Sequence, residues 1–306
     1  MYMGKNTQQE VMINGIKVGI TSPDKPLWPN LDILKLHYLE YLAKMAPFLL
    51  PFLQNRALTV IRYPHGAGDE RFYQKNCPDY APDFVETVFE DGIHYIVCNN
   101  LQTLLWLGNQ LAFELHIPFR KNGTAYPSEI VMDLDPPSRD DFILSVEAAL
   151  LIQEVCDRLK LKTFIKTSGN KGLQVYIPLP EARFTFDDTR KFTHFLAQYL
   201  ITKEPQWFTI ERLKKNRGNK CYIDFIQHAE GKTIIAPYSV RGNEEALVAT
   251  PIHWQELTRD LRPEAFPLPI IHRRVLENGD PFEEFEKAKT SQPFGPVLDW
   301  LNEQGL

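Results

Sequence analysis

Two aspartates near the middle of the chain, Asp133 and Asp135, have the spacing of a metal site. The apolar residues Ile130, Val131 and Met132 predict a short buried strand, which must end at the two prolines that follow the aspartates. Because side chains at positions i and i+2 of a strand point the same way, both carboxylates are expected on one face, roughly 6 to 7 Å apart. Carboxylates held in this way suit Mg²⁺ or Mn²⁺, and such an ion commonly holds phosphate oxygens.

A third acid supports a metal site. The aspartate pair alone could equally be part of a solvated turn before the prolines. Asp224, however, lies within the otherwise apolar segment 221–226, where an unpaired carboxylate is costly. If it simply faced outward on an alternating strand, Tyr222 and Ile226 would share its exposed face. Asp224 is therefore the expected third metal ligand.

A glycine-containing turn is expected between two strands at residues 167–172, which read Thr-Ser-Gly-Asn-Lys-Gly. Its backbone N–H groups and the side chains of Ser168 and Lys171 could hold a phosphate, although such a composition is also common in plain hairpin loops. From Lys203 to Arg241 eight Lys or Arg residues stand against four Asp or Glu residues, which predicts a basic surface. Three acids, a phosphate-binding turn and a basic surface together are typical of two-metal nucleotidyl transfer.

The elements expected to position these residues alternate between strands and helices. Apolar spacing predicts a helix over residues 31–46, capped by Asn30 and ended by Pro47, and a second over 100–116 with His116 at its C-terminal end. Further helices are expected over residues 140–160 and 186–200, the latter capped by Asp187 or Asp188, and less regular ones over 251–257, 282–289 and 294–302. Hairpins are expected over 13–20 and 84–98, with turns at Asn-Gly and Asp-Gly.

The composition narrows the class of protein. With 306 residues, 43% of them hydrophobic, the chain can bury a large core, and its net charge of −5 argues against a protein that coats nucleic acid through overall charge. The four cysteines are spread singly, which predicts reduced thiols in the cytoplasm. The polar residues 1–10 predict no signal peptide, and the most apolar stretch, 45–53, is short and broken by prolines, so no membrane span is expected.

Six segments of the chain resemble one family. They are TSPDKPLWP, RFYQK, LAFELHIP, VMDLDPP, KTSGNKGLQVYIPL and IDFIQHAEGKTIIAPYSVRG, and they span most of residues 20–245. In this order they are similar to the archaeo-eukaryotic primase superfamily and, within it, to the polymerase domain of bacterial DNA ligase D and its stand-alone relatives.

This resemblance implies roles for particular residues. The metal triad would be Asp133, Asp135 and Asp224. The incoming nucleotide would meet Ser168, Lys171, His116, Arg241 and, less typically, Gln174. DNA would meet a template platform of Phe72 and Tyr73, the template contact Arg62, and Lys25 and Lys17 at a 5′-phosphate. Gln174 departs from the family turn S-G-x-x-G-x-H, because a neutral amide offers no positive charge to a triphosphate, and Ile61 stands where a basic residue is common.

The resemblance also implies a fold and an activity. The fold is mixed α+β, with a central antiparallel or mixed β-sheet as catalytic core (residues 126–245), an N-terminal α/β shell (1–125) and a C-terminal helical segment (246–306), all in one primase-polymerase domain (1–306). The activity is template-dependent nucleotidyl transfer with two Mn²⁺ or Mg²⁺ ions and a preference for ribonucleotides. In non-homologous end joining, this activity would fill gaps and extend ends at DNA double-strand breaks that carry a 5′-phosphate. The implied location is the nucleoid, in the cytoplasm. Ku and a DNA ligase are the implied protein partners.

Two other classes of function remain as alternatives. A sugar-nucleotide transferase or an aspartyl phosphatase also uses an Asp-x-Asp pair, but such phosphatases need a hydroxyl-bearing residue soon after the second aspartate, where this chain has Pro136 and Pro137. A non-catalytic module that bridges DNA ends through the 5′-phosphate would keep Lys25 and the aromatic residues but would not need three acids. The acids therefore favour catalysis.

Overall fold

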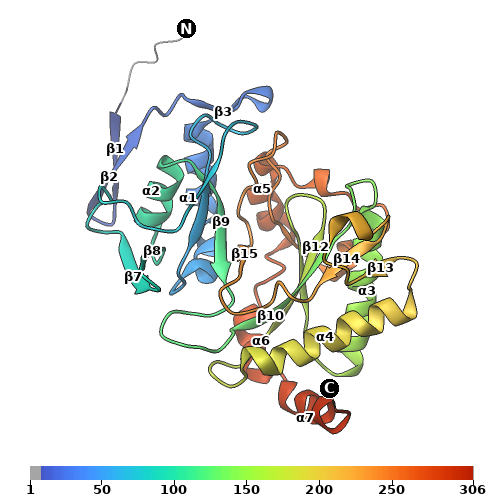
Figure 1. Cartoon of the computed structure of the whole chain (residues 1–306). Coiled ribbons are helices and arrows are strands. Elements are labelled where there is room, and N and C mark those ends of the chain that lie inside the picture. Colours follow the sequence, from blue (N-terminus) through green and yellow to red (C-terminus); the bar gives the residue numbers. More distant parts are fainter. Residues whose placement is uncertain (1–7, 306) are drawn as a thin grey trace. The chain divides into compact units, whose positions relative to one another are not determined.

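The structure, a computed structural model, describes residues 8–305, so most of the segment predicted to lack a signal peptide lies outside the described part. The chain forms two compact units, each built from several stretches of sequence (Figure 1). Among the described residues, unit 1 comprises 8–117, 235–249 and 266–278, and unit 2 comprises 118–234, 250–265 and 279–305. The mixed α+β class expected from the sequence is confirmed.

A four-stranded sheet in the order β15-β9-β5-β6 belongs largely to unit 1. These strands are β15 (Thr233–Ile235), β9 (Ala112–Pro118), β5 (Thr59–Arg62) and β6 (Phe72–Gln74). Three two-stranded sheets complete its strands: β1 (Gln8–Ile13) with β2 (Ile16–Thr21), β3 (Pro26–Trp28) with β4 (Ile33–Leu34), and β7 (Glu86–Glu90) with β8 (Ile93–Val97). Its helices are α1 (Lys35–Leu53), α2 (Leu101–Asn109) and α5 (Leu268–Asn278), with a 3₁₀ turn at η1 (Pro29–Leu31).

Aromatic rings form much of the core of unit 1. The ring of Phe113 on β9 stacks between those of Trp28 and Tyr63, with centroid distances of 4.4 and 5.0 Å. Tyr38 of α1 meets the same ring edge-on and donates its hydroxyl hydrogen to the carbonyl of Ala112 at 2.6 Å. Since large buried rings dominate core energetics, this cluster fixes β9 and its polar residues firmly in place.

Two helix predictions in unit 1 are wrong at their ends. Helix α1 begins at Lys35 instead of residue 31, and it continues through Pro47 and Pro51 to Leu53. Each internal proline costs a helix about 3 kcal/mol, but burial of the last turn, which includes Phe52 and Leu53, offsets that cost.

The helix predicted over 100–116 ends at Asn109, and Asn100 is its N-cap, whose side chain accepts from the Thr103 N–H. Leu111 has a positive φ of 62°, and the chain then enters β9, so His116 lies on a strand and not at a helix end. Within β9 the apolar residues Phe113, Leu115 and Ile117 alternate with Glu114 and His116, which is the period of a strand, so the helical pattern was continued too far.

Unit 2 contains a six-stranded sheet in the order β13-β14-β10-β12-β11-β16. The strands are β13 (Phe208–Thr209), β14 (Cys221–Asp224), β10 (Glu129–Asp135), β12 (Leu173–Pro178), β11 (Phe164–Thr167) and β16 (Pro251–Ile252), and all neighbours are antiparallel except β13 and β14. Helices α3 (Phe142–Arg158) and α4 (Phe186–Lys203) pack against β10, and α3 also packs against β12 (Figure 1). The unit ends with α6 (Phe285–Ser291) and α7 (Phe294–Glu303), and 3₁₀ turns occur at η2 (Lys214–Asn216), η3 (Trp254–Glu256) and η4 (Pro263–Ala265).

The ends of unit 2 elements differ from the sequence prediction in two places. The N-cap of α4 is Thr185, and Asp188, one of the two caps predicted, instead closes the capping box from the third helical position. The helix predicted over 251–257 is a short strand, β16, followed by η3.

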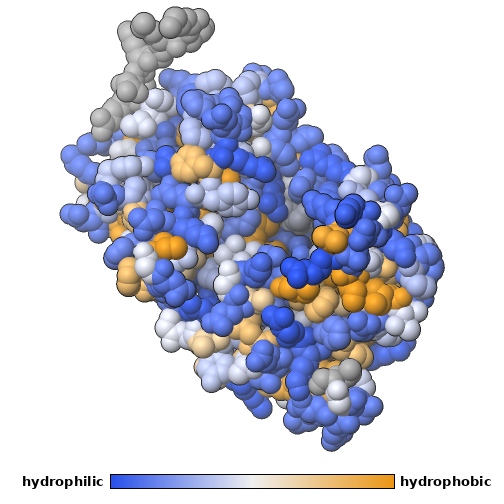
Figure 2. Space-filling model, in the orientation of Figure 1, coloured by the Kyte–Doolittle hydropathy of each residue, from blue (hydrophilic) through white to orange (hydrophobic). Residues whose placement is uncertain are grey.

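None of the helices in residues 8–305 is both long and apolar enough to cross a membrane. The face drawn in Figure 2 is mostly hydrophilic, and its apolar residues lie in separate patches.

Candidate active site

The register of unit 2 brings the three acids onto one face of the sheet. Asp133 on β10 lies directly opposite Asp224 on β14, and Asp135 lies opposite Tyr222. Residues directly opposite each other in an antiparallel pair point to the same face, and like charges in that position destabilise the pair unless they are compensated. The site therefore concentrates negative charge at the end of β10.

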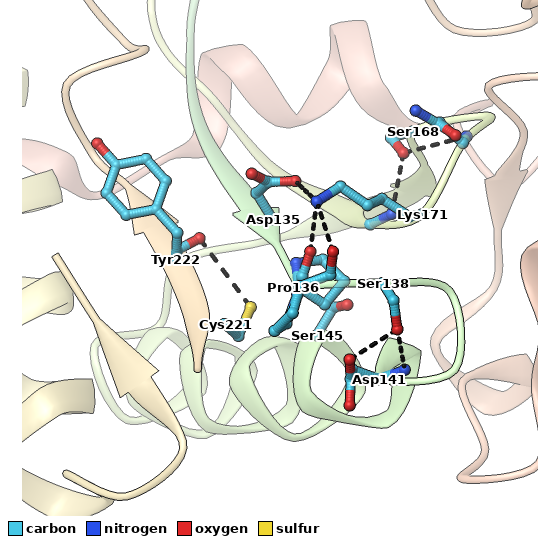
Figure 3. Close-up of polar contacts among 12 residues, drawn as sticks. Asp135, Pro136, Ser138, Asp141, Ser145, Ser168, Lys171, Cys221 and Tyr222 are labelled. Carbon is cyan, nitrogen blue, oxygen red and sulfur yellow. Dashed lines mark hydrogen bonds and ion pairs between the residues drawn. The ribbon is translucent and has the colours of Figure 1, made fainter. Parts of the chain in front are cut away.

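Each acid has its own polar partners. Asp135 forms an ion pair with Lys171 Nζ at 2.8 Å (Figure 3). It forms a second ion pair with Arg217 Nη1 at 3.2 Å. Gln174 Nε2 donates to Asp133 Oδ1 at 3.0 Å. Within residues 8–305, no group of three or more His, Cys, Asp or Glu side chains is arranged to hold a metal ion. The strand places Asp133 and Asp135 on one face, as their spacing predicts, while the acids are turned toward protein donors.

The hydrogen-bond donors of Asp224 are neutral groups. Asp224 accepts hydrogen bonds from the Tyr222 hydroxyl and from the Gln227 N–H, both at 3.1 Å. Burial, with a smaller contribution from the nearby Asp135 carboxylate, nevertheless raises the pKa of Asp224 above its ordinary value. A divalent cation would relieve this charge, and three carboxylates on one face are donors of the kind that Mg²⁺ and Mn²⁺ prefer. The three carboxylates thus match such an ion in donor type and share one sheet face, while in this arrangement they are engaged with protein donors.

The turn between β11 and β12 lies against the end of β10. Lys171 Nζ reaches the carbonyl of Pro136 as well as Asp135 (Figure 3). Gly172 makes this approach possible, because a Cβ there would stand 2.1 Å from the carbonyl oxygen of Leu134. The N–H groups of Asn170 and Gly172 donate to Ser168 Oγ at 3.2 and 3.1 Å. These two N–H groups therefore stabilise the turn itself, and Lys171 supplies the positive charge beside the acids.

Gln174 is almost fully buried, with 2% of its surface exposed. It lies opposite Asp133 on one side and Lys166 on the other, so these residues form a polar row across three strands. Its Oε1 atom has no hydrogen-bond partner among the described residues. A buried acceptor without a partner costs about 1 to 3 kcal/mol, so this amide is held in place at a cost to stability.

The other two predicted nucleotide contacts, His116 and Arg241, lie in unit 1 and share a carboxylate. Glu114 Oε2 stands 3.1 Å from His116 Nε2 and accepts a hydrogen bond from Arg241 Nη1 at 2.7 Å. The sequence analysis did not identify Glu114. Its signal was available, because it is an acid within a buried strand, as Asp224 is.

The predicted template platform is also in unit 1. Phe72 and Tyr73 on β6 have exposed fractions of 43% and 67%, which is unusual for aromatic residues in a sheet. Arg62 on β5 lies opposite Phe72, with its guanidinium carbon 5.3 Å from the ring centroid, and it donates to Gln74 and Tyr80. Exposed rings beside a guanidinium can stack bases and hold phosphates.

The two lysines predicted at a 5′-phosphate have different surroundings. Lys17 is exposed on β2 and pairs with Glu10 at 3.0 Å. Lys25 lies beside Lys35, whose backbone N–H donates to the Lys25 carbonyl at 2.8 Å. The Lys35 Nζ atom donates to the carbonyl of Thr21 at 2.6 Å. Burial and the charge of Lys25 lower the pKa of Lys35 to about 8. The sequence analysis missed Lys35, because a lysine at the start of an amphipathic helix is usually solvated.

The arrangement of these elements has a counterpart among solved structures. The polymerase domain of ligase D from Mycobacterium tuberculosis, solved in complex with DNA, matches with a TM-score of 0.79 and 28% identity over 90% of this chain and 98% of that one. The fold is therefore the primase-polymerase fold. Residues 34–282 also match the family model of the LigD primase-polymerase domain, and the chain belongs to that family.

Curated relatives show the same family and are longer than this chain. The bifunctional non-homologous end joining protein LigD of Bacillus subtilis is 46% identical over 288 residues, which cover 94% of this chain and 47% of the relative. The multifunctional non-homologous end joining protein LigD of Mycolicibacterium smegmatis is 31% identical over 79% of this chain and 32% of the relative. The chain thus spans about half or less of these relatives, and the resemblance read from the sequence is confirmed.

Proposed function

We propose that the chain is a template-dependent nucleotidyltransferase that fills gaps and extends ends at DNA double-strand breaks in non-homologous end joining. It uses two Mn²⁺ or Mg²⁺ ions, prefers ribonucleoside triphosphates, and acts in the nucleoid with Ku and a DNA ligase. The polymerase domain of the M. tuberculosis relative was solved with DNA, and the relatives named above are end-joining proteins. These facts support the DNA substrate and the pathway.

The observation that carries the proposal is the shared face of Asp133, Asp135 and Asp224 beside Lys171. In catalysis the three carboxylates would hold the metal ions, which when bound would supply the positive charge that lowers the pKa of the primer 3′-hydroxyl and stabilises the departing pyrophosphate. Lys171 is then released from Asp135 and pairs with the triphosphate. Because both partners of this ion pair are more than a quarter exposed, its exchange for a phosphate costs little.

The remaining residues bind DNA in this proposal. Phe72 and Tyr73 stack on the template, and Arg62 holds its backbone. Lys25 binds the 5′-phosphate, and the buried Lys35 beside it adds positive charge that the phosphate would compensate. The same residues could serve a module that only bridges DNA ends, so the test must separate DNA binding from chemistry.

The test is extension of a labelled primer on a gapped duplex, with Mn²⁺ and either ribo- or deoxynucleotides, and with a 5′-phosphate or a 5′-hydroxyl at the gap. The native chain should add the templated nucleotide, faster with ribonucleotides and with the 5′-phosphate. The Asp133→Ala/Asp135→Ala variant should bind the same DNA and add nothing. Binding of the phosphorylated gap without any extension by the native chain would instead favour the end-bridging function.

The Gln174→His variant should bind the incoming nucleotide more tightly than the native chain. An imidazole at this position could keep the hydrogen bond to Asp133 and place partial positive charge near the triphosphate, which the neutral amide cannot do. We expect KM for the nucleotide to fall about 3-fold with kcat little changed, as for a gain in uniform binding. Steady-state single-nucleotide extension measures this, and an unchanged or higher KM would contradict it.

A further inference from the structure

Glu114 is the centre of a hydrogen-bonded cluster in unit 1. Its side chain is almost fully buried, with 5% exposed. One oxygen accepts from the Tyr63 hydroxyl at 2.6 Å and from the Gly242 N–H at 3.3 Å. The other lies 2.7 Å from Arg241 Nη1 and 3.1 Å from His116 Nε2. Both carboxylate oxygens are therefore used, and both predicted nucleotide contacts of unit 1 share one of them.

The carboxylate of Glu114 is ionised despite its burial. Burial alone would raise its pKa, but the hydrogen bond from His116, the charge of Arg241 and the hydrogen bond from Tyr63 together hold the pKa of Glu114 well below its ordinary range. A buried carboxylate with these partners is held rigidly. It orients the imidazole and the guanidinium, which on their own would have several rotamers.

The cluster extends toward the aromatic residues of β6. Arg71 donates a hydrogen bond to the hydroxyl of Tyr63, and the next residue is Phe72. Gly242 lets the Tyr63 ring approach, because a Cβ there would stand 2.0 Å from the ring carbon Cζ. Polar contacts thus run without a break from Arg71 through Tyr63 to Glu114, and from there to Arg241 and His116.

We propose that Glu114 is a positioning residue for the incoming nucleotide. It holds His116 and Arg241 in the orientation that binds the triphosphate and, through Tyr63 and Arg71, fixes them relative to the template platform of Phe72 and Tyr73. This inference rests on the proposed polymerase function and deepens it. Glu114 itself does not touch the nucleotide, so its effect acts through the two side chains it orients.

The effect should appear in nucleotide affinity. Removing the charge from one partner of a buried charge-assisted hydrogen bond weakens what it positions by about 10-fold. Glu114→Gln should therefore raise both KM and the dissociation constant for a ribonucleoside triphosphate with Mn²⁺ by about 10-fold, and change kcat at saturation by less than about 2-fold. In an Arg241→Gln background the same change should have less than about half of this effect on the free energy of nucleotide binding, because one of the side chains to be oriented is already lost.

The experiment is a double-mutant cycle with two readouts. Binding of ATP and Mn²⁺ by calorimetry, without DNA, is measured beside single-nucleotide extension for the native chain, Glu114→Gln, Arg241→Gln and the double variant. Glu147→Gln is the matched control, because Glu147 also pairs with an arginine, Arg259, at 2.6 Å but lies on α3 of unit 2. Should Glu114→Gln fail to fold, Tyr63→Phe keeps the carboxylate, removes one of its donors, and should weaken binding by about 3-fold with the same dependence on Arg241.

The outcomes separate this inference from the proposed function. Weaker binding that depends on Arg241, with the control unchanged, supports it. Two results would overturn the positioning role and leave the polymerase function intact. In the first, Glu114→Gln binds the nucleotide and extends the primer as the native chain does. In the second, its effects on kcat and KM simply add to those of Arg241→Gln. Absence of both binding and extension in the native chain would overturn both.

Discussion

Asp224→Asn should abolish primer extension, by on the order of 10³-fold or more, while leaving DNA binding intact. Asparagine keeps the shape of the side chain and can still accept from Tyr222 and Gln227, but it removes one of the three charges on the shared face. The metal site would then keep only the carboxylates of Asp133 and Asp135, so metal binding would weaken. Extension with Mn²⁺ on the gapped duplex and a gel-shift of the same duplex measure the two properties separately.

The same substitution should not destabilise the metal-free fold. Because the pKa of Asp224 is raised in the folded state, its ionised form costs stability at neutral pH, and that cost disappears as the pH falls below the ordinary range of an aspartate. Asparagine carries no such cost. Thermal unfolding in a chelator should therefore show the variant at least as stable as the native chain at pH 7, with the difference vanishing below about pH 4.

Two results would contradict this argument. Extension within about 10-fold of the native rate would show that Asp224 is not a metal ligand. A variant clearly less stable than the native chain at neutral pH would show that the charge of Asp224 is compensated in the fold and that the acid has a structural role. Activity gained at the cost of stability is the usual sign of a functional acid.

Local sequence was enough to predict much of the unit 2 site. Asp133 and Asp135 share a face because of strand geometry alone, and the prolines after them end the strand as expected. The turn at Ser168 and the acid strand at Asp224 are likewise local features. What the sequence did not show is the register that places Asp224 opposite Asp133, which depends on contacts between residues about 90 positions apart.

The site in unit 1 was harder to predict for the same physical reason. His116 was expected at a helix end because the helical pattern that starts at Asn100 was continued past Asn109, although Phe113, Leu115 and Ile117 alternate with polar residues as in a strand. The roles proposed for Glu114 and Lys35 depend on partners outside their own elements. The partner of Glu114 is Arg241, which is distant in sequence, and that of Lys35 is Lys25. Pairing of this kind is set by the tertiary fold, and no pattern in a single segment reports it.

Gly172, the second glycine of the Ser-Gly-Asn-Lys-Gly turn, should also be needed for full activity. Gly172→Ala places a Cβ that would be 2.1 Å from the carbonyl oxygen of Leu134, so either the turn or the end of β10 must move. We expect a loss of about 2 to 4 kcal/mol in the free energy of unfolding, as for severe overpacking. Since Lys171 precedes this glycine, extension should also fall by about 100-fold, because a shift of about 1 Å at a reacting centre is enough for such a loss.

Gly295→Ala is the matched control for this prediction. Neither glycine has the positive φ that excludes alanine, and the nearest atom to a Cβ at Gly295 is the flexible end of Arg183 at 3.4 Å. The control should therefore change stability by less than about 0.5 kcal/mol. Urea unfolding of both variants, followed by single-nucleotide extension under conditions where each is fully folded, separates the two effects. If Gly172→Ala were as stable and active as the control, the close approach of the turn to β10 would not be what places Lys171 beside Asp135.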